Sequence, residues 1–299
     1  MVIGLHGALK KIGIADVLAA LAATPRHEIL HAVLLLGVSV CIMSAYDLPG
    51  VTFARRGQKF PRLGLHRIGL ASFCAYALSH VLGAPALSAA AIRLRLYAQW
   101  GVPPAGIGRI MALSGSTFAI GFCAMLGLLL LLHPHAVPVF GHAAPGPLRL
   151  TGAILAGIAA TYVAAARGRD SVTLLGRDIA LPGARLALAQ ILLSGADMAI
   201  SSAILYTVLP GAPGLTYPHV LSIYLAAFAS GAISGLPGGV GVFDSVLLLG
   251  LSEYLLPASA LGAILLFRVM YFLAPACLAG LCYAAHELWV HTRATGEKS

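Results

Sequence analysis

Seven apolar segments, separated by short polar loops, constrain the fold of this chain more than any other feature. Hydrophobic residues make up 59% of the chain and charged residues only 10%. Most segments approach or exceed the roughly 20 residues that a helix needs to cross a bilayer. We therefore expect an all-α fold, a polytopic integral membrane helical bundle. The apolar segments are 28–46, 68–91, 110–132, 149–166, 186–208, 218–256 and 258–285.

The basic residues lie in particular loops and indicate the topology. Lys and Arg occur in loops 48–67, 92–109 and 167–185 and in the C-terminal tail, whereas loops 133–148 and 209–217 contain none. The positive-inside rule places the basic loops in the cytoplasm and the other two outside. The basic residues behind the net charge of +9 are thus divided among short loops, where they determine the topology. This placement argues against a nucleic-acid-binding surface.

Two of the segments are expected to break and fold back. Segment 68–91 has a basic loop at each end, so a single crossing cannot leave both ends in the cytoplasm. We expect it to be re-entrant, with a break near Gly83-Ala84-Pro85. By the same argument segment 218–256 enters from outside and breaks at Gly235-Leu236-Pro237.

The second break contains residues that a plain spanning helix would not tolerate. The run 231–244 holds five glycines, a proline and an aspartate within an otherwise apolar segment. Proline removes a backbone donor, and clustered glycines destabilise a helix. Backbone freed at membrane depth must be buried in protein or line a wet cavity, so this run predicts a site.

The two breaks resemble copies of one unit. Residues 73–85 align with 225–237 at an offset of 152, and 44–47 align with 194–197 at an offset of 150. The loop charges give the copies opposite topology. Interrupted segments in inverted halves are typical of a transporter site near the membrane midplane. Chance similarity between helices rich in Ala, Gly and Ser is the alternative.

Ionisable residues within the apolar segments need a partner or a wet cavity, because burying them in a membrane is costly. Arg268 is the most isolated, and it could bind a carboxylate, Asp244 or Asp197, or a lipid phosphate. A structural Arg–Asp pair is the alternative reading. Asp47 is expected at the membrane interface.

Arg93 and Arg95 lie where the first broken segment is expected to leave the membrane. Their spacing separates the two side chains around a helix, so one can face inward and the other the headgroups. For Arg95 the topology role is favoured.

No catalytic or metal-binding pattern stands out, and we expect no cofactor. The five cysteines lie in apolar segments without a CxxC pair, and three histidines of the outer loop lack an accompanying acid or cysteine. No serine sits on a nucleophile elbow. Residues 171–182 predict a small cytoplasmic hairpin that turns at Gly176-Arg177-Asp178.

Taken together, the segments resemble the transmembrane flippase-like domain of the lysylphosphatidylglycerol synthetase (multiple peptide resistance) family and its stand-alone relatives. The match runs from about residue 28 nearly to the end of the chain. Its pieces are Ala45-Tyr-Asp47, 72–79 with Gly83, 91–97 with Trp100-Gly101, Ala196-Asp197 with Leu205-Tyr206 and Leu209-Pro210, 234–244, and Arg268 with Tyr271 and Pro275.

The resemblance implies a bacterial inner-membrane domain that moves phospholipid between leaflets. Full-length members add a cytoplasmic aminoacyl transferase domain, so a chain ending at Ser299 is expected not to make lysylphosphatidylglycerol itself. Relatives usually begin with a further helix before the amphipathic segment represented here by 7–22, and Asp244 stands where glutamate is common. Both are departures from the family pattern.

The leading hypothesis is therefore a non-enzymatic translocase of anionic or aminoacylated phospholipid, with a cavity between the two broken segments. The alternatives are a non-transporting scaffold or regulator of an envelope-lipid enzyme and, less favoured, a lipid-modifying enzyme. Expected partners are phospholipid and the membrane, with a separate synthase and a second copy of the chain as candidates. The expected parts are an N-terminal amphipathic segment 1–27, a transmembrane domain 28–285 and a cytoplasmic tail 286–299. The candidate lipid-binding residues are Arg93, Asp197, Gly235, Pro237, Gly238, Gly239, Gly241, Asp244 and Arg268.

Overall fold

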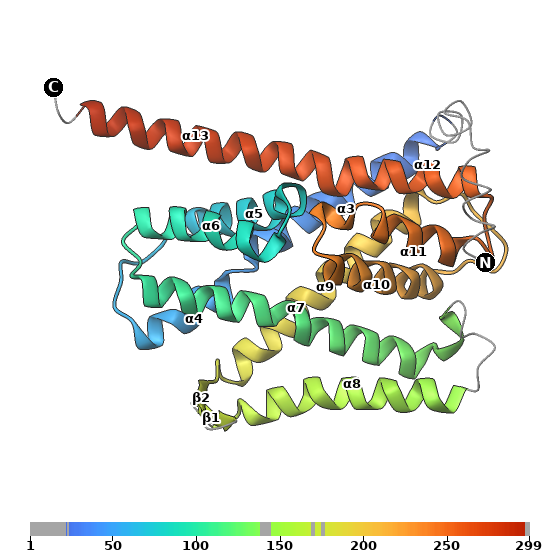
Figure 1. The fold of residues 1–299 in the computed structure, drawn as a ribbon, viewed down its shortest axis with the longest axis horizontal. Coiled ribbons are helices and arrows are strands. Elements are labelled where there is room, and N and C mark those ends of the chain that lie inside the picture. Colours follow the sequence, from blue (N-terminus) through green and yellow to red (C-terminus); the bar gives the residue numbers. More distant parts are fainter. Residues whose placement is uncertain (1–21, 23, 138–144, 169–170, 175–176, 297–299) are drawn as a thin grey trace.

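The computed structural model describes residues 22, 24–137, 145–168, 171–174 and 177–296, and these are almost entirely helical (Figure 1). The elements are α3 (Arg26–Ala45), α4 (Leu48–Gly57), α5 (Leu65–Leu82), α6 (Pro85–Gln99), α7 (Pro104–Leu132), η1 (Pro134–Ala136), α8 (Pro145–Ala165), β1 (Ser171–Leu174), β2 (Arg177–Ala180), α9 (Ala184–Val208), α10 (Tyr217–Ser234), η2 (Pro237–Gly239), α11 (Val242–Leu251), α12 (Pro257–Phe267), the π-helix η3 (Arg268–Leu273) and α13 (Ala274–Gly296).

The expected helical membrane bundle is confirmed. Among the described residues, five helical stretches are long and apolar enough to cross a membrane. They are Arg26–Gly57, Pro104–Leu132, Pro145–Ala165, Ala184–Val208 and Pro257–Thr292. The chain is therefore a multi-pass membrane protein.

The two broken segments fold back as helical hairpins that enter the bundle from opposite ends (Figure 1). Helices α5 and α6 form one hairpin, and α10 and α11 form the other. If η2, which precedes α11, is counted with the second hairpin, each of its boundaries lies 152 residues after a counterpart in the first: 217 after 65, 234 after 82, 237 after 85 and 251 after 99. The expected pair of interrupted segments is thus present, and the two hairpins point in opposite directions (Figure 1).

The hairpin tips meet inside the bundle. A Cβ atom added to Gly83 at the first tip would lie 2.9 Å from Cγ of Pro237 at the second. Gly83 also has a φ of +81°, so both the turn and the contact favour glycine. The breaks fall at the expected residues, and Gly83 and Gly239 are buried where the two tips meet.

The two ends of the bundle differ in charge as the loops predict. The left end in Figure 1 carries α4, the β1–β2 hairpin and the last turns of α13, and the right end carries the starts of α8 and α12. Arg56 of α4 donates a hydrogen bond of 2.7 Å to the carbonyl of Pro182 near the hairpin. Basic segments far apart in the sequence thus gather at one end.

Some expected boundaries were wrong. Residues 48–57, expected as loop, form α4, because Pro49, Gly50 and Val51 are buried and Gly50 lets α4 pack closely on Ile110. Loop 92–109 is also shorter than expected, since α6 continues to Gln99 and α7 begins at Pro104.

The expected hairpin between α8 and α9 is present, but Leu174 pairs with Arg177, so Arg177 and Asp178 belong to the second strand and not to the turn. Helix α13 continues through the predicted boundary at 285 to Gly296. The predicted amphipathic segment 7–22 lies almost wholly outside the described residues.

The topology can be tested with single cysteines in a chain whose five native cysteines are replaced. Lys59 lies at the basic end and Pro213 in the uncharged loop after α9, and both residues are exposed. In intact spheroplasts an impermeant maleimide should label Pro213→Cys, and it should label Lys59→Cys only after the membrane is permeabilised. Labelling of Lys59→Cys alone in intact spheroplasts would contradict this topology.

Candidate functional site

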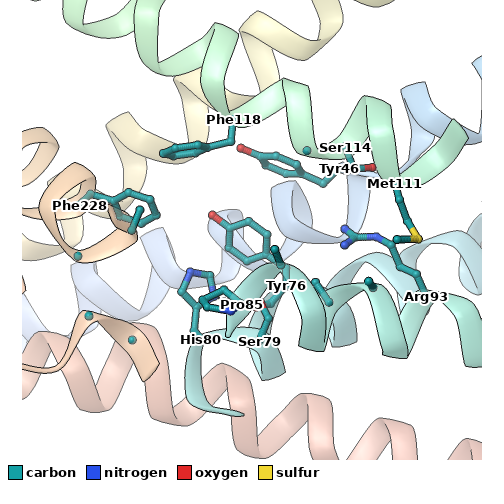
Figure 2. A pocket seen from close by; sticks show the side chains of 18 of the residues that line it. Tyr46, Tyr76, Ser79, His80, Pro85, Arg93, Met111, Ser114, Phe118 and Phe228 are labelled. Carbon is teal, nitrogen blue, oxygen red and sulfur yellow. Dashed lines mark hydrogen bonds between the residues drawn. The ribbon is translucent and has the colours of Figure 1, made fainter. Parts of the chain in front are cut away.

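A cavity of about 630 Å³ lies between the first hairpin, α7 and the tip of the second hairpin. Figure 2 shows its side chains reaching inward from these elements. Its larger and polar lining residues include Tyr46, Tyr76, His80, Arg93, Phe118 and Phe228. This volume falls within the range of ~300–1,000 Å³ that is usual for small-molecule sites.

Small residues on two facing helices leave this space open. Ala86 and Ala90 lie on the face of α6 that also carries Arg93, while Gly108 and Gly115 lie on one face of α7. A Cβ atom added to either glycine would meet no described atom within 4 Å. The cavity therefore results from missing side chains on two otherwise regular helices.

The glycine-rich break closes one end of the cavity. Gly231, Gly238 and Gly239 all line it. A Cβ atom on Gly239 would lie 2.9 Å from Cα of Gly231, and one on Gly238 would lie 3.0 Å from the His80 carbonyl oxygen. The glycines thus let α10, η2 and the end of α5 approach closely around the space.

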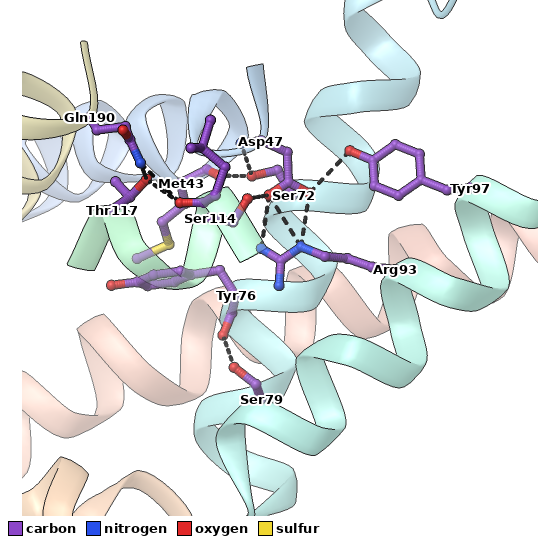
Figure 3. A network of polar contacts seen from close by, with 11 residues as sticks. Met43, Asp47, Ser72, Tyr76, Ser79, Arg93, Tyr97, Ser114, Thr117 and Gln190 are labelled. Atoms are coloured by element: carbon purple, nitrogen blue, oxygen red, sulfur yellow. Dashed lines mark hydrogen bonds and ion pairs between the residues drawn. The ribbon is translucent and has the colours of Figure 1, made fainter. Parts of the chain in front are cut away.

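A buried ion pair between Arg93 and Asp47 forms a second wall (Figure 3). Nη2 of Arg93 donates to Asp47 Oδ1 at 2.9 Å, and Nε donates to Oδ2 at 2.9 Å. Ser114 of α7 donates to Oδ1 at 2.7 Å and Tyr97 of α6 to Oδ2 at 3.0 Å. The carboxylate is fully buried and accepts hydrogen bonds from two helices besides the bidentate arginine.

Asp47 was expected at the membrane interface, and that prediction was wrong. The residue forms the corner between α3 and α4, and its backbone N–H donates to Ser72 Oγ of α5. Because α4 packs against α7, the corner is covered on both sides. An aspartate that follows an apolar helix and precedes a proline gave no sequence signal for this burial.

The two arginines of α6 separate as predicted. Arg93 is 8% exposed and faces the cavity and Asp47. The Arg95 side chain is 56% exposed and pairs with Glu287 of α13 at 2.8 Å. Their spacing on α6 places one side chain inside the bundle and the other at its basic end.

Arg268 pairs with Asp244 and not with Asp197, the other carboxylate that the sequence offered as a partner. Its Nη2 donates to Asp244 Oδ2 at 2.9 Å and to the Gly238 carbonyl at 3.2 Å. The guanidinium carbon lies 5.4 Å from the ring centre of Phe243 and 5.2 Å from that of Phe272. The arginine therefore fastens α11 and the glycine-rich turn to η3.

Asp197 of α9 has a different environment. It is 4% exposed, and its Oδ2 accepts a hydrogen bond of 2.7 Å from Tyr76, a cavity residue. No described residue forms an ion pair with it. Asp197 thus lies behind the tyrosine wall of the cavity.

The predicted site residues therefore fall into three places. Arg93, Gly238 and Gly239 line the large cavity, while Pro237, Gly238 and Arg268 line a neighbouring cavity of about 210 Å³. His80, Gly238 and Phe272 line both cavities. Gly235 and Gly241 shape the turn through positive φ angles, and Asp197 and Asp244 lie outside both linings.

Sequence reasoning missed Tyr46, Tyr76, His80 and Ser114, all of which line the large cavity. Tyr76 and His80 lie in the repeated segment 73–85, and polar side chains within that apolar segment could have indicated that it lines a site. The sequence around Ser114 holds no such signal, because single serines are frequent in membrane helices.

No family model matches the chain. The chain is 31% identical over 297 residues to "Uncharacterized protein slr0712" of Synechocystis sp., which covers 99% of this chain and 90% of that protein. It is 30% identical over 282 residues to "Inner membrane protein YbhN" of Escherichia coli, covering 93% and 86% of the two chains.

The chain thus has the size and helical organisation of a polytopic inner-membrane protein. It belongs to the family of YbhN-like inner membrane proteins. A shorter match, 39% identical over 66 residues, links it to a phosphatidylglycerol lysyltransferase of Staphylococcus haemolyticus and covers 22% of this chain and 8% of that protein. The membrane family and inner-membrane location are therefore established, while the resemblance to the lysylphosphatidylglycerol synthetase family extends over a limited part of the chain.

Removing one member of the buried ion pair should strongly destabilise the protein. Asp47→Ala leaves the Arg93 guanidinium buried without its carboxylate, which we expect to cost about 3–5 kcal/mol. Glu287→Ala breaks the partly exposed pair with Arg95 and should cost no more than about 1 kcal/mol. Melting of the detergent-solubilised protein measures both effects.

A double variant separates charge from packing. Asp47→Leu with Arg93→Met replaces the pair by apolar side chains and should recover most of the stability that Asp47→Ala loses. Equal melting temperatures for Asp47→Ala and Glu287→Ala would contradict a structural role for the buried pair.

Proposed function

We propose that this protein binds an anionic or aminoacylated phospholipid in the large cavity and moves it between the two leaflets. The observation that carries the proposal is a mostly apolar cavity between two opposed hairpins, with an arginine donor at its wall. The proposal assigns the chain no chemical step.

Arg93 can supply a contact to a phosphate. Its Nε and Nη2 bind Asp47, whereas Nη1 makes none of the hydrogen bonds found among the described residues. Because Arg93 lines the cavity, this nitrogen can donate to a phosphate oxygen. The Asp47 carboxylate neutralises the guanidinium, so the site offers an oriented donor and little net charge.

The start of α6 provides a second contribution. Pro85 and Ala86 line the cavity at the first turn of this half-helix. Pro85 has no N–H and the N–H of Leu87 donates to the Ala84 carbonyl, so the Ala86 amide and the partial positive charge of the helix end are what this turn offers an anion. Discontinuous helices place such ends at substrate sites in transporters.

Lipid tails need a path to the bilayer, and the hairpin tips are apolar and exposed. Leu87 is 73% exposed, Ile233 is 88% exposed and Val240 is 60% exposed. Ala86, Ala232 and Leu236 beside them are exposed and also line the cavity. This arrangement supports lateral entry of a lipid whose headgroup lies in the cavity and whose tails remain among the tips.

The short match to a protein whose name describes lysyl transfer to phosphatidylglycerol also supports a lipid substrate. The alternative is a non-transporting scaffold for an envelope-lipid enzyme, which is favoured by the pairing of Arg93 and Arg268 with carboxylates. The two functions differ in whether the purified chain alone moves lipid.

Exchange of fluorescent phospholipid in proteoliposomes tests the proposal, with a matched pair of glycine variants. Gly115→Leu fills part of the cavity and should slow exchange roughly tenfold if it removes about 1.4 kcal/mol of lipid affinity. Gly157→Leu places the same side chain on the outer face of α8, where no described atom lies within 4 Å, and should leave exchange unchanged.

Folded wild-type protein that gives no more exchange than protein-free vesicles would contradict translocation and favour the scaffold. An equal loss of lipid exchange in both glycine variants would mean that a leucine on either helix disturbs the protein, and that filling the cavity is not the cause.

A further inference from the structure

Five buried oxygen atoms that lack a well-formed hydrogen bond lie at and around Asp197. They are all the buried side-chain polar atoms of this kind in the described part of the chain: Ser39 Oγ, Tyr46 Oη, Ser194 Oγ, Asp197 Oδ1 and Tyr271 Oη. The hydroxyls of Ser39 and Tyr271 face the carboxylate and make weak hydrogen bonds to it. The hydroxyls of Tyr46 and Ser194 make a similar weak contact with each other, and the charge of Asp197 acts on the Tyr46 hydroxyl. Buried polar atoms normally have well-formed hydrogen bonds, so loosely bonded hydroxyls gathered around a carboxylate without a counter-charge point to an occupant.

The cluster is assembled from distant parts of the sequence. Ser39 comes from α3, Tyr46 from the corner after it, Ser194 and Asp197 from α9, and Tyr271 from the π-helix η3. All of these residues are less than a tenth exposed. A π-turn within an α-helix is frequently found at a functional site, and this one directs Tyr271 towards Asp197 and Arg268 towards Asp244.

The charge of Asp197 is not balanced by protein. Asp47 and Asp244 each pair with an arginine, whereas Asp197 is faced by neutral hydroxyls, with that of Tyr76 at 2.7 Å. The titratable groups that face it are all tyrosines: Tyr46, Tyr76 of α5, Tyr224 of α10 and Tyr271. Water could satisfy the hydroxyls, but it would not neutralise a buried carboxylate.

We propose that Asp197 and the surrounding hydroxyls form a binding site for one monovalent cation, either a proton on the carboxylate or Na⁺ held by the oxygens. One carboxylate balances one positive charge, and an all-oxygen donor set suits a hard cation. Transporters with discontinuous helices bind such ions beside the substrate site.

The cation site touches the wall of the large cavity. Tyr46 and Tyr76 both line the cavity and both interact with Asp197. A cation on Asp197 would alter the hydrogen bonds open to these tyrosines and so the shape of the wall. If the chain translocates lipid, as proposed above, this contact is a route for coupling; the cation site itself does not depend on that function.

Melting of the purified full-length chain, measured against pH in NaCl and in choline chloride, tests the site without a transport assay. In choline chloride the wild type should lose stability as the pH rises, because the buried carboxylate ionises without a counter-charge. Asp197→Asn should remove this dependence, and Glu253→Gln, at an exposed acid, should retain it. Binding of radioactive Na⁺ to the same samples separates the two ions.

If Na⁺ is the ligand, it should raise the melting temperature at alkaline pH and bind at about one ion per chain, and Tyr271→Phe should weaken binding by roughly tenfold or more. If the proton is the ligand, the pH dependence should persist unchanged in NaCl, with no bound Na⁺. A wild-type chain whose stability matches that of Asp197→Asn at every pH in both salts would overturn the proposal. Should Asp197→Asn not fold, the wild-type salt and pH series and Tyr271→Phe decide the same question.

Discussion

The buried pair of Arg93 and Asp47 is the interaction on which the arrangement around the cavity depends. It joins the corner between α3 and α4 to α6, and Ser114 and Ser72 extend the connection to α7 and α5. Two charges removed from water need good geometry and further hydrogen bonds to be tolerated, and this pair has both. The pair fixes the first hairpin against the bundle and leaves one guanidinium nitrogen for a ligand.

The second hairpin is held by the corresponding means at the other end. Arg268 binds Asp244 and the Gly238 carbonyl, so the turn that would otherwise be a weak point is tied to η3. Glycines then allow the two tips to touch, as Gly83 does against Pro237. The cavity between the hairpins follows from these two anchored breaks and from the small residues on α6 and α7.

The sequence predicted the fold best where a residue type is incompatible with a continuous membrane-spanning helix or with the other orientation of a loop. Glycine and proline at 235–241 required a break, and loop charges required two hairpins of opposite direction; both features are present. The separation of Arg93 from Arg95 followed from helical spacing. The burial of Asp47 and the hydroxyls around Asp197 could not be predicted, because they depend on packing between helices that are far apart in the chain. The unexpected helix α4 is a related case, since its buried face is defined by α7 and not by its own pattern.

The central claim is that a phospholipid headgroup occupies the cavity beside Arg93. Cryo-electron microscopy of the protein in nanodiscs containing an anionic phospholipid tests this most directly. The account predicts headgroup density within about 3 Å of the free guanidinium nitrogen of Arg93, with tails leaving past Ile233 at the hairpin tips. A cavity closed by protein, or one that contains only ordered water in the same nanodiscs, would contradict it.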